Sequence, residues 1–217
     1  MDATRRQRTL RAIALMGIGT AAGLVASLDP LRALRTPAFL LMTLGMAAWT
    51  VVENLALRQD EPQDYHGKRN TRLLQAGVMI GILVGVLDLF HLPPAHPSWL
   101  TASGFAILLA GGAIRVLAIR TLAQHFRYEL RVEEGQRLVR TGLYARVRHP
   151  SYLGLLLIAV GAPLTLASWI GALVSLAILL PLIALRIRDE ERVLEEGFGA
   201  EYDRYRGESW RLLPYVY

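Results

Sequence analysis

The sequence contains no cysteine among its 217 residues. Disulfide bonds, thiolate metal sites and cysteine nucleophiles are therefore excluded. Charged residues are scarce as well, at 19%, whereas hydrophobic residues make up 53% of the chain. An average globular chain is about 25% charged, so this composition is too apolar for an ordinary soluble domain. It indicates an integral membrane protein.

Lysine is almost absent, since the basic side chains are 23 arginines and only one lysine, Lys68. The formal net charge is +6. In a membrane protein such an excess orients the helices and attracts anionic lipid, so we expect no nucleic-acid partner. The five histidines do not cluster at metal-ligand spacing, and we expect no metal. Sequence motifs of serine hydrolases, zinc proteases and P-loop enzymes are also missing.

Six apolar runs approach the roughly 20 residues that a helix needs to cross a bilayer. They are 12–28, 37–57, 73–90, 99–122, 151–166 and 169–185. The first run follows four arginines and could instead be a signal peptide. Because helices of the same kind follow it, we favour an uncleaved helix. Only Ala167 and Ser168 separate the last two runs, which predicts a tight helical hairpin.

We therefore expect an all-α integral membrane protein with about six transmembrane helices and a helical tail at the C-terminus. Its predicted organisation is a four-helix membrane region over residues 1–122 and a catalytic region over residues 123–217. Most arginines fall in three polar segments, 58–72, 123–149 and 186–217. The positive-inside rule places these segments and both termini in the cytoplasm, with the chain in the inner (plasma) membrane.

The most informative stretch spans residues 136–154 and reads Q-R-L-V-R-T-G-L-Y-A-R-V-R-H-P-S-Y-L-G. Pro150 forces His149 out of the α region, and proline is favoured at the first position of a helix. His149 should therefore lie at the mouth of a membrane helix, whose free N–H groups and positive dipole end favour an anion. The other interpretation of this stretch is a basic juxtamembrane loop with interfacial tyrosines.

A second polar group of residues follows the hairpin. Arg186 and Glu190 are four residues apart and share one helix face, while Glu191 lies on another. We expect Gly197 and Gly199 to end this helix. A solvated amphipathic helix with i,i+4 ion pairs is the other interpretation.

The charged residues inside the predicted spans include Glu53, Asp88 and Arg115. Ionisable groups in a membrane span mark functional sites by default, although residues near a helix end can extend to the interface. Arg115 lies about two turns from the end of its run. It is a candidate to hold a carboxylate or phosphate of a substrate, since arginine binds both bidentately.

Together the two polar stretches resemble the isoprenylcysteine carboxyl methyltransferase family. The pattern is L-V-x-T-G-x-Y-x-x-V-R-H-P-S-Y-x-G, a hairpin, and then R-x-x-x-E-E-x-x-L-x-x-x-F-G-x-E-Y-x-x-Y with a closing proline. It covers about residues 120–217. Members of this family are membrane enzymes that use S-adenosyl-L-methionine, and phospholipid N-methyltransferases are similar.

The resemblance implies roles for the residues at matching positions. The cofactor-binding positions are Gln136, Arg137, Leu138, Val139, Tyr144, His149, Pro150, Ser151, Tyr152 and Glu190. Arg186 matches a position that contacts substrate in the eukaryotic enzymes. Family members often have histidine where this chain has Gln136, which still donates and accepts hydrogen bonds.

The residues themselves suit this chemistry. A helix N-terminus with Arg148 and His149 suits the carboxylate of the cofactor, and Glu190 suits its amino group or ribose hydroxyls. The tyrosines can stack on adenine or face the sulfonium by cation–π contact. We take Arg186, Glu190 and Glu191 as the catalytic candidates, with Arg186 and Arg115 as substrate-binding candidates.

We therefore expect S-adenosyl-L-methionine-dependent methyl transfer to a lipophilic acceptor, an isoprenoid-type carboxylate or thiol, which enters from the membrane. A carboxylate acceptor needs no general base, so catalysis would rest on positioning and desolvation. A phospholipid amine acceptor would have to lose a proton, for which Glu190 or Glu191 could serve. A small membrane transporter without enzymatic activity is the alternative from another class.

Overall fold

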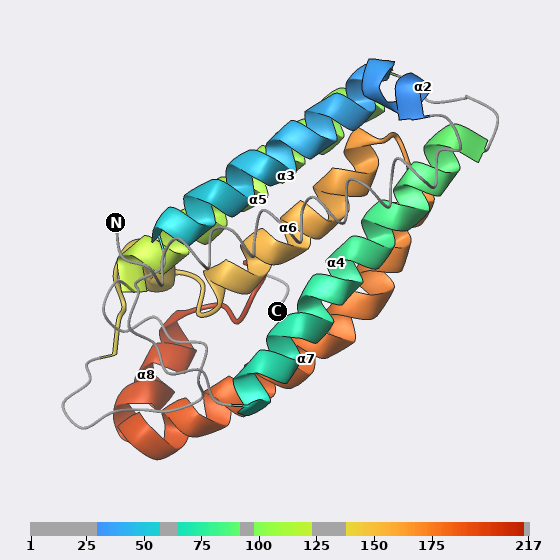
Figure 1. Ribbon diagram of the computed structural model, residues 1–217. Coiled ribbons are helices and arrows are strands. Elements are labelled where there is room, and N and C mark those ends of the chain that lie inside the picture. The colour runs from blue at the N-terminus through green and yellow to red at the C-terminus, as the bar shows by residue number, and fades with distance from the viewer. Residues whose placement is uncertain (1–29, 57–64, 92–97, 123–137, 215–217) are drawn as a thin grey trace, which may run out of the picture.

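The computed structural model describes residues 30–56, 65–91, 98–122 and 138–214, and these are helical almost throughout. The helices are α2 (Pro30–Arg35), α3 (Pro37–Ala56), α4 (Tyr65–His91), α5 (Ser98–Leu122), the short 3-10 helix η2 (Gly142–Ala145), α6 (Pro150–Thr165), α7 (Trp169–Phe198) and α8 (Ala200–Glu208). Figure 1 shows α3 to α7 as one elongated bundle, with η2 and α8 gathered at one end. The predicted all-α class is confirmed.

Three helical segments are long and apolar enough to cross a membrane, Arg72–His91, Ser98–Leu122 and Trp169–Phe198. Two shorter apolar helices, Pro37–Glu53 and Pro150–Thr165, accompany them. The first predicted run, 12–28, lies outside the described residues. The chain is an integral membrane protein, and the count of six spans stays a prediction.

The hairpin between α6 and α7 forms where the sequence predicts it. Ala167 takes a left-handed φ of 59°, and the Oγ of Ser168 accepts a hydrogen bond of 3.0 Å from the Gly171 N–H. This side-chain cap satisfies one of the free amide groups at the start of α7. The turn comprises Leu166, Ala167 and Ser168, one residue more than the two that separate the predicted runs.

Helix α7 is longer than the last predicted run. The sequence analysis ended that run at residue 185, whereas α7 continues without a break to Phe198. No glycine or proline interrupts the charged residues that follow, so the helix simply extends beyond its apolar part. Gly197 was expected to end the helix but lies inside it, and Gly199, with a φ of 50°, is the residue that ends it.

Glycines bring α5 and α6 into direct backbone contact. A Cβ atom added at Gly111 would lie 2.8 Å from the carbonyl oxygen of Gly154, and one added at Gly154 would lie 2.7 Å from the carbonyl oxygen of Gly111. The pair α4 and α7 meets in the same way, since a Cβ at Gly171 would lie 2.7 Å from the carbonyl oxygen of Gly81. Small residues at such crossings let the helix backbones approach closely, so that van der Waals packing can hold helices together in lipid.

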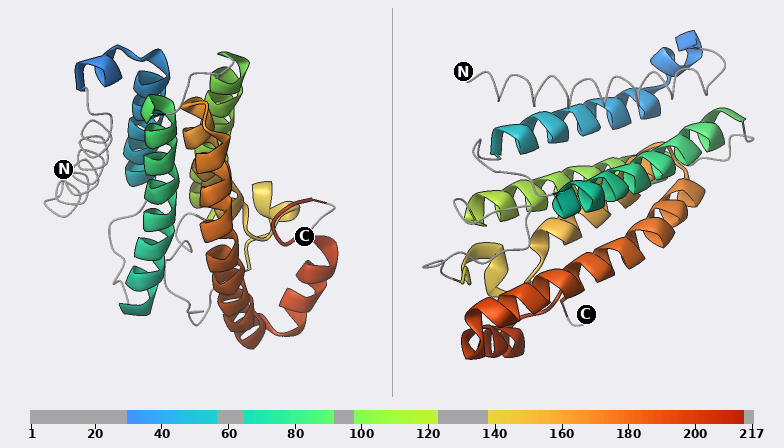
Figure 2. Two further views of the ribbon diagram at one scale, coloured as in Figure 1. Left: turned by 90° about the vertical axis from the view of Figure 1, so that its right-hand side faces the viewer. Right: turned by 60° about the horizontal axis from the view of Figure 1, so that its bottom comes forward.

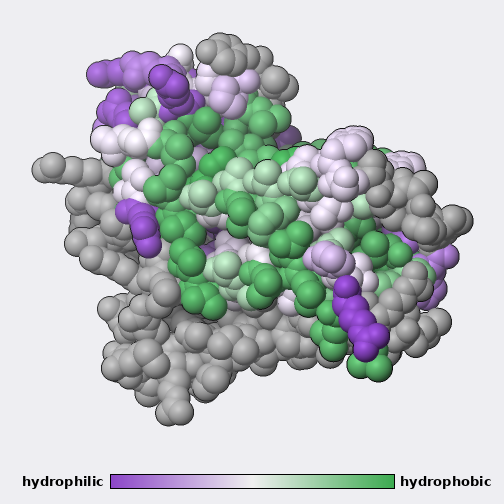
Figure 3. All heavy atoms as spheres, turned by 90° about the horizontal axis from the view of Figure 1, so that it is seen from above, coloured by the Kyte–Doolittle hydropathy of each residue, from purple (hydrophilic) through white to green (hydrophobic). Residues whose placement is uncertain are grey.

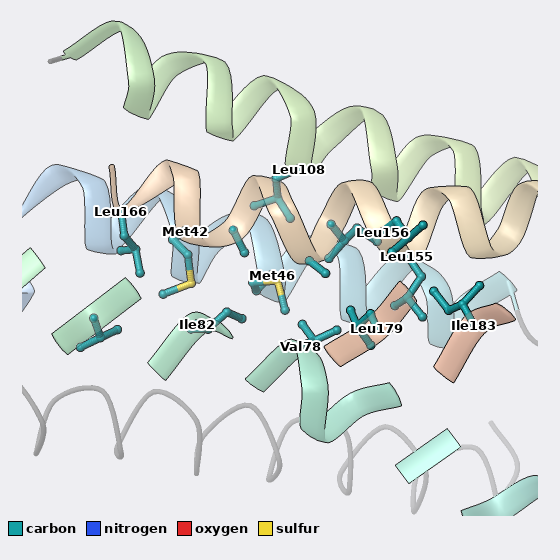
Figure 4. Close-up of a cluster of buried hydrophobic side chains, with 14 of the residues drawn as sticks. Met42, Met46, Val78, Ile82, Leu108, Leu155, Leu156, Leu166, Leu179 and Ile183 are labelled. Carbon is teal, nitrogen blue, oxygen red and sulfur yellow. The ribbon is translucent and has the colours of Figure 1, made fainter. Parts of the chain in front are cut away.

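The core lies between these two helix pairs (Figure 4). Side chains from α3, α4, α5, α6 and α7 meet there, and their buried members include Met46, Ile82, Leu108, Leu156 and Ile183. Aliphatic side chains also remain exposed on the outside of the bundle, and Leu185 retains 57% of its accessible surface. Figure 3 shows a broad hydrophobic area on one face, with hydrophilic residues toward its margins. This distribution suits a lipid-facing surface.

The contact between α5 and α6 can be tested with two neighbouring glycines. We expect Gly111→Ala to lower the free energy of unfolding by about 1–3 kcal/mol, because the added methyl group overpacks the crossing. Thermal unfolding in detergent measures this change. Gly112→Ala is the matched control, because the nearest atom to its new Cβ is a Trp49 side-chain carbon 3.7 Å away. Equal stability of the two variants would contradict the crossing.

Candidate active site

The C-terminal segment after α8 returns to the start of α6 and pairs with it. The N–H of Arg148 donates to the Trp210 carbonyl at 2.8 Å, the N–H of Trp210 donates to the Arg146 carbonyl at 2.8 Å, and the N–H of His149 donates to the Arg211 carbonyl at 3.2 Å. Figure 2 shows this return, with the last described residues beside η2. Two parts of the chain about 60 residues apart thus frame one polar region.

Helix η2 is held in the same region. Gly142 starts it with a φ of 60°, a left-handed conformation that glycine adopts without strain. Tyr144 is buried, and its carbonyl oxygen accepts a hydrogen bond of 2.7 Å from the Tyr205 hydroxyl. Burial raises the pKa of Tyr144 above its ordinary value of 10, so the ring stays neutral.

His149 lies between two carboxylates. It caps α6 with a non-helical backbone (φ −124°, ψ 57°), and Pro150 opens the helix as predicted. Its Nδ1 is 3.3 Å from a Glu190 oxygen, and its Nε2 is 3.4 Å from a Glu191 oxygen. Burial alone would lower the pKa of His149, but close contact with the two glutamates and their negative charges outweighs burial and raises the pKa above 6.5. The imidazole is thereby favoured in its charged form.

Glu190 is bound by a tyrosine and flanked by an arginine. The Tyr152 hydroxyl donates to Glu190 at 2.8 Å, and the Arg186 Nε donates to the same hydroxyl at 3.2 Å. Arg186 also lies 3.6 Å from a Glu190 oxygen. The Glu190 side chain keeps 24% of its surface exposed, so the carboxylate can still take a ligand group.

Glu191 is engaged by two arginines and is nearly closed to solvent. The Arg148 Nε donates to it at 3.0 Å, and Arg211 approaches its other oxygen at 2.7 Å. Only 7% of the Glu191 side chain is exposed. Arg148 also donates to the carbonyl oxygens of Arg206 and Ser209. Glu191 and Arg148 therefore fasten the returning tail.

Arg115 and Ser151 form a separate buried contact, which does not include Glu190 or Glu191. The Arg115 guanidinium binds the Glu53 carboxylate at 2.8–3.0 Å, and its Nη1 donates to the Oγ of Ser151 at 2.9 Å and to its carbonyl oxygen at 3.2 Å. This contact joins α3, α5 and the first turn of α6. Arg115 acts here as a positioning residue, and its role in holding substrate stays a prediction.

The structure thus brings most of the predicted residues together at one end of the bundle. Leu138 and Val139 are half-buried near η2, while Gln136 and Arg137 lie outside the described residues. The sequence reasoning did not find Arg211, Ser209 and Trp210, which contact the predicted residues directly. No spacing signal points to them, since the closing proline comes after them and the chain reaches α6 only by folding back.

Comparisons with known proteins give the family. A model of the isoprenylcysteine carboxyl methyltransferase (ICMT) family matches residues 104–196. The protein-S-isoprenylcysteine O-methyltransferase A of Arabidopsis thaliana is 32% identical over 149 residues, which cover 67% of this chain and 76% of the relative. This chain belongs to the ICMT family. It is a methyltransferase, so the resemblance is confirmed and the transporter alternative is not supported.

One further relative and one solved structure are also similar to this chain. A probable protein-S-isoprenylcysteine O-methyltransferase of Oryza sativa subsp. indica is 28% identical over 163 residues, which cover 70% of this chain and 85% of the relative. A solved structure of the eukaryotic intramembrane Ras methyltransferase ICMT superposes with a TM-score of 0.61 at 20% identity. The superposition covers 94% of this chain and 75% of that one. At that identity the match shows the fold alone.

Because His149 is charged, the stability of the folded protein should depend on pH in a defined direction. Because its folded-state pKa is raised, its contribution to stability is complete below about pH 6.5 and is lost as pH rises through the folded pKa. We expect the stability difference between wild type and His149→Gln to shrink over that range, by at most about 1.4 kcal/mol per pH unit. Thermal unfolding in detergent from pH 6 to 9 measures it.

The matched control is His91→Gln, which removes an exposed histidine at the end of α4. This variant should follow the pH profile of wild type. A difference between wild type and His149→Gln that grows with rising pH would mean that the imidazole is neutral between the two glutamates.

Proposed function

We propose that this methyltransferase uses S-adenosyl-L-methionine to methylate the carboxylate of an isoprenylcysteine-type acceptor at the cytoplasmic face of the membrane. The observation that carries the proposal is the position of Glu190. Its carboxylate is held by Tyr152, flanked by His149 and Arg186, and still open to solvent on one side. The names of the relatives support an oxygen of isoprenylcysteine as the acceptor atom in those proteins.

The residues fit the cofactor by their chemistry. Its amino-acid end carries an ammonium and a carboxylate, and the region offers a carboxylate in Glu190 and a buried imidazolium in His149. Tyr152, which binds Glu190, and the buried Tyr144 in η2 supply aromatic rings. We assign Glu190 to the amino group and His149 to the carboxylate, with Gln136, Arg137, Leu138, Val139, Pro150 and Ser151 as further cofactor-binding positions.

When bound, S-adenosyl-L-methionine supplies an electrophilic methyl group on a sulfonium. An acceptor carboxylate is already ionised at neutral pH, so its oxygen would be the nucleophile toward that methyl group, and the electron pair of the carbon–sulfur bond would remain on sulfur. No proton has to be removed, and the chain needs no general base for this acceptor. The residues then act by holding the reactants in line and excluding water.

Arg186 is the residue we assign to the acceptor. Its Nε lies 3.2 Å from the Tyr152 hydroxyl, so its positive charge is close to the group that binds Glu190. A carboxylate beside this guanidinium would lie next to the assigned cofactor position. A phospholipid amine, the alternative acceptor, would gain nothing from that positive charge, since it is cationic until it loses a proton.

We further propose that residues 123–217 form the cofactor-binding region, while the helices before them shape the pocket for the lipophilic part. The arginine-rich segments 58–72, 123–149 and 186–217 support a cytoplasmic site. Both termini would then face the cytoplasm from the inner (plasma) membrane. The acceptor would enter laterally from the bilayer, with its reacting end at headgroup depth.

Glu190→Gln tests the cofactor assignment. The change keeps the shape of the side chain and removes its charge, so binding should weaken by about 1.5–3 kcal/mol, or roughly 10–150-fold. Isothermal titration calorimetry with S-adenosyl-L-methionine measures this affinity. Glu196→Gln, on the exposed face of the same helix, should bind like wild type. Equal affinity of Glu190→Gln and wild type would remove Glu190 from the cofactor site.

Acceptor entry from the bilayer predicts a dependence on chain length. Each buried methylene contributes about 0.8 kcal/mol, so KM should fall several-fold for each pair of added methylenes until the pocket is full. Methyl transfer to matched short-chain and long-chain carboxylate acceptors in nanodiscs measures this trend. Turnover restricted to fully water-soluble acceptors would overturn lateral entry and favour a small polar substrate.

A further inference from the structure

A polar pocket lies on the face of α7 opposite Arg186 and Glu190, and it shares Glu191 and Arg211 with the network around the candidate active site. Residues 186 and 190 share one side of the helix, whereas residue 188 is offset by two positions, about 200° around the axis, from each of them. On the far side α7 exposes Leu173, Leu180 and Leu185, and then Arg188 and Arg192. One continuous face thus changes from apolar to cationic within a single turn after Leu185.

The pocket has a volume of about 330 Å³ and lies where this face of α7 changes from apolar to cationic residues. That size falls within the range of small-ligand sites, about 300–1,000 Å³. Its lining is Ala184, Leu185, Arg188, Glu191, Arg192, Glu195, Arg206 and Arg211. The two apolar residues lie toward the lipid-facing part of α7, and the charged residues lie toward α8 and the returning tail.

Two of the four arginines in the lining are neutralised by the two glutamates. Arg211 binds Glu191 at 2.7 Å, and Arg206 forms an ion pair with Glu195. Within the described residues, Arg188 and Arg192 have no acidic partner, and both are exposed. The pocket therefore presents two uncompensated guanidinium groups, one helical turn apart, directly beyond an apolar face.

We propose that this pocket binds the phosphate of an anionic phospholipid, with the acyl chains lying along the exposed leucines of α7. Paired guanidinium groups match the geometry of phosphate oxygens. The apolar wall that joins the pocket to the lipid-facing helix favours a lipid over a free phosphate ion. The methyl acceptor is a poorer fit, because the pocket lies on the side of α7 away from Glu190 and Tyr152.

Such a lipid would bind next to a residue that shapes the active site. Glu191 lines the pocket and also holds Arg148 and Arg211, which fasten the returning tail against the start of α6. A phosphate at Arg188 and Arg192 adds negative charge beside this network without touching Glu190. The lipid therefore stabilises the tail and leaves the cofactor contacts in place.

The test uses the full chain, purified in a neutral detergent and titrated with short-chain phosphatidic acid. Native mass spectrometry counts the bound lipid, and thermal unfolding reports the stabilisation. We expect one phosphatidic acid per chain and a rise in Tm. The double variant Arg188→Gln/Arg192→Gln should weaken this binding at least tenfold. It should leave calorimetric affinity for S-adenosyl-L-methionine unchanged, so the result is independent of the proposed function.

The matched control is Arg146→Gln/Arg204→Gln, which removes two exposed arginines outside the pocket. It should retain phosphatidic acid binding, and phosphatidylcholine should bind neither protein. Equal loss of binding in both double variants would overturn the proposal in favour of nonspecific charge attraction. Equal stabilisation by inorganic phosphate alone would overturn it as well, since the pocket would then take a free ion.

Discussion

The end of the bundle that carries the candidate active site depends on one buried imidazole held between two carboxylates. His149 can stay charged in an interior position only because Glu190 and Glu191 lie on either side of it. Those glutamates are in place only because α7 continues as a helix beyond its apolar part. The tail, in turn, closes over Glu191 through Arg211. Removing the imidazole would therefore leave both carboxylates without the cation that lies between them.

Features encoded by neighbouring residues could be predicted from the sequence. Pro150 starts α6, Gly142 makes its turn, and Ala167 and Ser168 close the hairpin, because each depends on the backbone preferences of one or two residues. The shared face of Arg186 and Glu190 follows from helix periodicity alone. The family resemblance rests on this same short-range pattern.

Contacts between distant parts of the chain could not be predicted in this way. Arg115 and Glu53 are 62 residues apart, and charge alone did not identify them as partners. The return of the tail to Arg148 depends on backbone hydrogen bonds, which leave no mark in the sequence, and on side-chain contacts that form only once the chain has folded back. A signal for the contact of α5 with α6 was nevertheless present, since Gly104 and Gly111 in one run and Gly154 and Gly161 in the other are both seven residues, about two turns, apart.

Because α7 continues from its lipid-facing part to Glu190, the thickness of the bilayer affects the position of the candidate active site. Glu190 follows Leu185 by five residues, which is about 7.5 Å along a helix axis. A helix whose apolar length exceeds the local hydrocarbon thickness tilts to compensate. Since Leu185 and Glu190 belong to the same uninterrupted part of α7, such a tilt would lower and rotate the carboxylate relative to the headgroups. The membrane in which the protein resides thus becomes a determinant of how deeply an acceptor must reach.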